Sequence, residues 1–193
     1  MIKKIATLLI MGLLVILLAT ACSSAPPPQD TVQKFFNALQ QRNFEEAQNY
    51  INGEKSPITY ESEEQKEIIE NFLDKIKCEI LSSEIKGDKA TVKVKITAPD
   101  LLRIITKTIS EMMPLAFASA FSEDPASQEE MDRMLLQHFI NSLNDPNAPS
   151  VVTETTISLT KTENKWLIEP SEDFLNALTG NIQKAFGVME EQK

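Results

Sequence analysis

Apolar residues recur at helical spacing in segment 31–41, which predicts the first helix of the folded part of the chain. Positions i, i+3, i+4 and i+7 of this segment are apolar and share one helix face. These positions are Val32, Phe35, Phe36 and Leu39. Asp30, with Gln33 three residues later, is close to a capping box, so we expect Asp30 to cap this helix.

Two more capping pairs predict two more helices. Asn43 with Glu46 opens a short helix, and Ser62 with Gln65 opens a longer one that runs to about Lys77. The short helix is expected to bury Phe44, Ala47 and Ile51. The longer one is expected to bury Ile68, Ile69, Phe72, Leu73 and Ile76.

The hydrophobic period then changes from about four to two. Residues 90–97 alternate strictly between apolar and polar side chains, which is typical of a half-buried strand. Turn residues at 86–89 make 78–85 its partner strand in a hairpin. A second hairpin is predicted from residues 151–161 and 166–168, with its turn at 163–164.

A final helix and a helical insert complete the pattern. Ser171 caps the final helix, which is expected to turn Phe174, Leu175 and Leu178 inward. The insert, residues 100–143, separates the two hairpins, and Pro114 is expected to kink or end its first helix. Ser127 with Glu130 is expected to open its second helix. One face of the first helix is lined by Leu101, Ile105, Ile109 and Met112. The apolar arc is widened by Leu102, Ile104, Met113, Leu115 and Phe117. The chain is therefore predicted to be an α+β domain, with N-terminal helices on a curved antiparallel sheet of two hairpins.

The N-terminus has the pattern of a lipoprotein signal peptide. Two lysines precede an apolar run over residues 5–18, small residues follow, and Cys22 stands directly after the expected cut. This order resembles the bacterial lipobox, and the resemblance implies lipid on Cys22. We therefore expect residues 1–21 to be removed, residues 22–29 to form a lipidated tether, and residues 30–193 to form one domain with its insert at 100–147. The expected location is the bacterial cell envelope: the outer face of the plasma membrane, or the outer membrane if the source has one.

Charge and cysteine content narrow the choice of partners. Without residues 1–21 the chain keeps 17 basic and 28 acidic residues, a formal net charge of −11, which argues against nucleic acid. If Cys22 carries lipid, Cys78 has no partner within the chain and is expected to be a small buried residue rather than a reactive thiol.

The arrangement of helices and hairpins resembles the ketosteroid-isomerase-like, or nuclear-transport-factor-like, cone fold. More narrowly, it resembles small bacterial lipoproteins of unknown function in that superfamily. The residues that carry this resemblance are Thr31–Leu39, Asn43–Ala47 and Lys165–Ile168. The resemblance implies that the first helix packs in a concave sheet with room for a pocket at the wide end. The long insert departs from the family's usual short connection.

Catalytic signatures are absent from the sequence, and we predict a protein that is not an enzyme and has no cofactor or metal. His138 is the single histidine, so no histidine cluster can bind zinc. The resembling superfamily uses an acid and a base inside an apolar pocket. Tyr50, Tyr60 and Asp100 are the candidates for such roles, but no motif aligns them with the family's catalytic positions.

The insert is the strongest candidate for a binding surface. Methionine-rich amphipathic helices form adaptable surfaces for apolar ligands or partner helices. The candidate residues are Met112, Met113, Phe117, Met131, Met134 and Leu135. Three interpretations follow: an anchored binding domain that holds an apolar ligand or an envelope protein under these helices, a scaffold lipoprotein without a pocket, or an isomerase-like enzyme.

Overall fold

The fold of the protein is described here from a computed structural model, which covers residues 25–120 and 125–182. The predictions for the signal peptide and for Cys22 concern residues outside this part of the chain. The elements in chain order are α2 (Pro28–Gln40), α3 (Phe44–Gln48), α4 (Glu63–Asp74), β1 (Lys77–Lys86), β2 (Lys89–Pro99), α5 (Leu101–Ala120), α6 (Pro125–Asn144), β3 (Ser150–Thr162), β4 (Lys165–Glu169) and α7 (Glu172–Leu178). The predicted α+β class, with helices before and between the strand pairs, is confirmed.

The four strands form one antiparallel sheet in the order β1-β2-β3-β4, and the sheet is not closed. Alternate residues of β2 are buried on one face, as predicted, and Val92 lies opposite Ile157 of β3. The other face is polar, with Lys93 paired to Glu154 across the strands at 2.9 Å. One face of the sheet therefore carries the main core and the other faces solvent.

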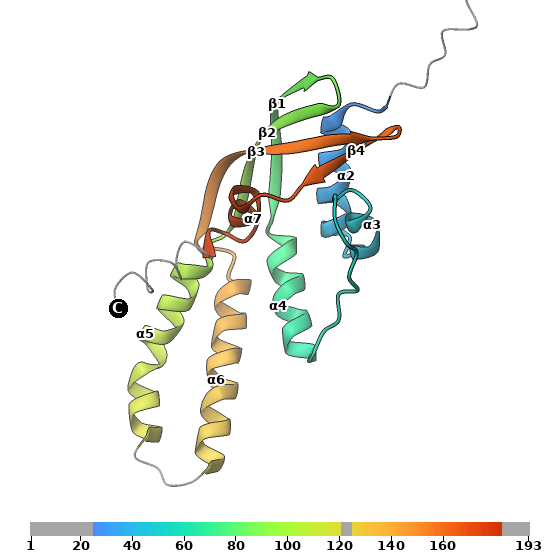
Figure 1. The fold of residues 1–193 in the computed structure, drawn as a ribbon. Helices are drawn as coiled ribbons and strands as arrows, with labels where there is room; N and C mark the ends of the chain where they lie inside the picture. Colours follow the sequence, from blue (N-terminus) through green and yellow to red (C-terminus); the bar gives the residue numbers. More distant parts are fainter. Residues whose placement is uncertain (1–24, 121–124, 183–193) are drawn as a thin grey trace, which may run out of the picture.

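Helix α2 crosses the buried face of the sheet (Figure 1). Its phenylalanines supply the aromatic centre of the core. The Phe35 and Phe36 rings lie 5.9 and 6.3 Å from the ring of Phe174 in α7. The predicted cap at Asp30 is wrong, because α2 begins two residues earlier with Pro28. Proline fits the first turn of a helix, because a backbone N–H at that position has no partner within the helix. The helix therefore begins before Asp30.

Three other predicted caps are confirmed. The side chains of Asn43, Ser62 and Ser171 accept hydrogen bonds from the backbone N–H three residues later, at 3.1 to 3.3 Å. Helix α4 ends at Asp74 rather than at about Lys77, because Lys77 already begins β1. Of its predicted core residues Leu73 and Ile76 are buried, and the other three are only half-buried.

The inward face of α7 differs in part from the prediction. Phe174 is buried, but Leu175 is 39% exposed, and Asn176 and Ala177 are buried in its place. The seven-residue helix packs on β2 and β3 through the residues beside Phe174, which leaves Leu175 turned outward.

The insert forms an arm of two antiparallel helices, α5 and α6, that projects from one end of the sheet (Figure 1). Helix α5 runs through Pro114 to Ala120, so it does not end at the proline. Helix α6 begins at Pro125, so Ser127 lies inside it rather than at its start. The start of α2 and the turn between β3 and β4 lie at the opposite end of the molecule.

Candidate functional site

The arm has buried residues of its own that are separate from the main core. The buried apolar residues of α5 and α6 are Ile104, Met112, Met131, Ile140 and Leu143, and none of them belongs to the main core cluster. Helix α5 packs on α6, which in turn touches α4. Across the two helices, His138 Nε2 lies 3.2 Å from Glu111 Oε2. The arm is thus an added unit, not a layer that completes the core.

A second apolar face of α5 has no cover among the described residues. Leu102, Ile109, Met113 and Phe117 are 45, 52, 48 and 64% exposed, whereas Ile104 in the same helix is 1% exposed. At about 100° per residue, these four positions fall within roughly a quarter of the helix circumference. They extend for about 22 Å along the axis at about 1.5 Å per residue. We call these four residues the apolar stripe.

Two cations lie near the base of the arm, Arg103 close to the edge of the stripe and Lys107 further around α5. Arg103 and Lys107 have side chains that are 74 and 56% exposed. They line, with Leu102 of the stripe, a shallow hollow of about 590 Å³ that also includes Pro149. Arg103 lies 3.4 Å from Asp100, and Lys107 lies 3.9 Å from Glu111. Because both side chains are more than half exposed, each cation can contact a further acidic group.

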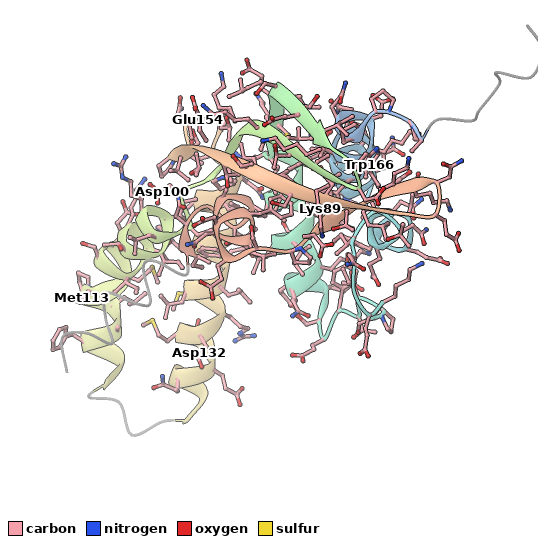
Figure 2. All side chains as sticks on the ribbon, turned by 45° about the horizontal axis from the view of Figure 1, so that its top comes forward. Lys89, Asp100, Met113, Asp132, Glu154 and Trp166 are labelled. Carbon is pink, nitrogen blue, oxygen red and sulfur yellow. The ribbon has the colours of Figure 1, made fainter. Side chains whose placement is uncertain are left out.

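The structure divides the six predicted surface residues into two groups. Met112 and Met131 are buried within the arm, and Leu135 is half-buried. Met113, Phe117 and Met134 are exposed. Figure 2 shows Met113 on α5, at the opposite end of the molecule from Trp166.

Ile109 was not predicted as a surface residue and was grouped on one face with Leu101, Ile105 and Met112. Leu102 was recognised only as widening the apolar arc. The apolar arc of α5 is wider than one neighbouring helix can cover. This excess width was the signal in the sequence that part of the arc is exposed. The sequence alone could not show which part of the arc faces α6.

A separate groove lies at the other end of the molecule, not beneath the arm. It has a volume of about 860 Å³ and is lined by the start of α2, residues 46–55 and the β3–β4 turn. The Tyr50 hydroxyl there donates to Glu46 Oε1 at 3.1 Å. Partial desolvation and this carboxylate raise the pKa of Tyr50. Three lysines, Lys34, Lys55 and Lys165, face two glutamates, Glu46 and Glu163, so the lining of the groove has a small positive excess.

The three candidates for acid–base chemistry lie in three different places. Tyr50 lines the groove, whereas the ring of Tyr60 packs edge-on against Phe44 with centroids 6.5 Å apart. Asp100 accepts a hydrogen bond from the backbone N–H of Arg103 at the base of the arm. The structure therefore does not bring a tyrosine and an aspartate together.

The remaining reactive side chains have structural surroundings. Cys78 is half-buried against the main core, and desolvation raises the pKa of its thiol to about 12. Within residues 25–120 and 125–182, no cluster of three or more His, Cys, Asp or Glu residues could hold a metal ion. Nor does any helix in these ranges have the length and apolar character needed to cross a bilayer.

Comparisons with family models, with curated proteins and with solved structures found no match for this chain.

Proposed function

We propose that this protein is a lipid-anchored interaction domain, not an enzyme, and that the apolar stripe of α5 binds an amphipathic helix of another envelope protein. The observation that supports this most is the exposure of four large apolar side chains in one line, on a helix pair outside the main core. A contiguous exposed apolar patch of this kind marks an interaction site more often than a chance arrangement.

The shape of the stripe favours a helical occupant. It is straight, narrow and uncharged, and its spacing of seven, four and four residues matches the anchors with which one helix packs against another. Arg103, close to its edge, favours a partner helix with acidic residues beside its own apolar face.

The expected anchor also favours a protein partner over lipid. If Cys22 carries lipid, the six residues 22–27 span at most about 19 Å, because an extended proline-rich chain advances about 3.1 Å per residue. The start of α2 would then lie near the bilayer, and the arm, at the other end of the molecule, would point away from it (Figure 1). The resemblance to cone-fold lipoproteins remains part of this proposal.

The anchor has a simple test. Cys22→Ser in the full chain should move the protein from the membrane fraction to the soluble fraction, because a lipid chain is lost. Ser23→Ala is the matched control and should stay with the membrane. Retention of the Cys22→Ser variant in the membrane would contradict lipid anchoring at this residue.

The binding surface is tested by placing a charge on the stripe. Met113→Asp puts a carboxylate where the partner's apolar side chains would pack, and quantitative mass spectrometry of the tagged, membrane-bound chain should show at least a tenfold loss of the partner. Ala118 is also exposed but lies on the other side of α5, about 140° around the helix from Met113. Ala118→Asp therefore adds the same charge away from the stripe and should keep the partner. Equal recovery with both variants would contradict the proposal.

The scaffold and isomerase-like alternatives are kept as rivals. A scaffold that does not use the stripe would give equal recovery in this experiment. An isomerase-like enzyme would need an acid and a base in one apolar pocket, and the separation of Tyr50, Tyr60 and Asp100 does not favour it.

A further inference from the structure

The last residues that the structure describes, 180–182, lie beside the Leu102 end of the apolar stripe, which we call its base. Gly180 has a φ of +65° and lies so close to the end of β2 that an added Cβ would be 2.1 Å from the Pro99 carbonyl oxygen and 3.8 Å from the Leu101 nitrogen. Asn181 is fixed next to it, because its side-chain amide donates to Thr153 Oγ1 at 3.0 Å. The residues that follow Asn181 therefore start next to the first turn of α5.

The sequence that follows has the chemistry expected of an occupant of the stripe. Ile182, Ala185, Phe186 and Met189 stand at i, i+3, i+4 and i+7, which places them on one face if the segment is helical. Glu190 and Glu191 come directly after them and end the apolar face with negative charge. The segment thus combines an apolar face with acidic residues, as proposed above for the partner.

We propose that residues 182–193 dock as a helix on the apolar stripe of the same molecule and act as an internal competitor of the partner. Twelve helical residues span about 18 Å, and the stripe from Leu102 to Met113 spans about 16 Å. A helix this short is marginal in water on its own, so it needs an apolar surface to form. Docking would cover the base of the stripe and leave Phe117 near the tip uncovered.

The tether makes this competition effective. A segment joined to its site by a short linker acts at a local concentration in the millimolar range, so a modest intrinsic affinity suffices. The regulatory consequence rests on the proposed function, because only a protein that uses the stripe has a partner to exclude. The docking itself does not depend on that function.

The docking is tested by disulfide formation in the full chain. Thr106→Cys lies within the stripe's face and Glu111→Cys lies on the other side of α5, and each is combined with Ala185→Cys. After oxidation of isolated membranes, mass spectrometry should find at least tenfold more of the 106–185 link than of the 111–185 link. Equal yields, no link, or links only between two copies would overturn the proposal, the last in favour of a second copy as the occupant.

A peptide of residues 181–193 with a fluorescent label gives an independent measurement. It should bind a chain that ends at residue 182 at least tenfold more tightly than it binds the intact chain, whose site is already covered. The Phe186→Asp peptide should bind the shortened chain at least tenfold more weakly than the native peptide does. Equal binding to both chains, or no binding, contradicts the docking. Either result leaves the partner test with Met113→Asp unaffected, so the two proposals fail separately.

Discussion

Replacing the arm with a short turn should leave a folded domain. Pro99 of β2 lies opposite Ser150 of β3, and the Asp100 N–H donates to the Pro149 carbonyl at 2.9 Å, so the two strand ends already meet. Substituting Asn-Gly for residues 100–149 would join them by a two-residue hairpin turn, which suits the twist of antiparallel strands.

This replacement removes few contacts to the rest of the domain. The main core loses none of its residues, because the arm's buried side chains lie outside it. The bond that Lys75 Nζ donates to the Asp145 carbonyl at 2.9 Å disappears, which costs about 1 kcal/mol. The contact of α4 with α6 is worth about 1.5–3 kcal/mol if it amounts to burying one large apolar side chain. The total of about 2.5–4 kcal/mol is below the roughly 5–15 kcal/mol by which a native domain is stable.

Urea denaturation followed by circular dichroism measures this directly. We expect one cooperative transition with a lower midpoint, and an m-value smaller than that of the full domain because less surface is exposed on unfolding. The replaced chain should also lose the stripe-dependent partner. A chain that is unfolded without urea would refute the argument and would make the arm part of the core.

Three further predictions concern single residues. Thr108 of the arm is 4% exposed, and its hydroxyl has no hydrogen-bond partner. Thr108→Val should therefore raise the free energy of unfolding by about 1 kcal/mol. A lower melting temperature would show that the hydroxyl is bonded. Cys78, with its thiol pKa raised to about 12, stays protonated at pH 8, so a thiol reagent should label it far more slowly in the native chain than in urea, and equal rates would contradict its burial. Gly180→Ala should lower stability by more than about 2 kcal/mol in urea denaturation, because the added Cβ would meet the Pro99 carbonyl. Gly87→Ala, with a similar φ of +62° but open space around it, should cost only about 1 kcal/mol. Equal costs would contradict the close packing of Gly180.

The elements that were predicted well are those with strong local signals. The caps at Asn43, Ser62 and Ser171 lie where their side-chain oxygens were expected, because a cap is decided within four residues. Both hairpins follow from alternation and turn residues for the same reason. The start of α2 was missed because Pro28 also suits a helix, and the nearest cap-like residue, Asp30, gave a competing local signal.

The candidate site was predicted only in part, because it depends on which face of α5 meets α6. Met113 and Phe117 were named as candidate surface residues, but Ile109 was grouped with Leu101, Ile105 and Met112 and was not named. The face of α5 that packs on α6 and the apolar stripe are both apolar. Hydrophobic periodicity therefore cannot tell which of them is buried. That separation requires the path of the arm in three dimensions, which the sequence of α5 does not contain.

The central claim, that the apolar stripe contacts a protein helix, is tested most directly by photo-cross-linking in living cells. A benzophenone amino acid replaces Met113 on the stripe or, as control, Ala118 on the other side of α5. The account predicts a cross-link from position 113 to an amphipathic helix of an envelope protein, mapped by mass spectrometry, with none from position 118. Cross-links from position 113 to lipid alone, or equal cross-links from both positions, would contradict it.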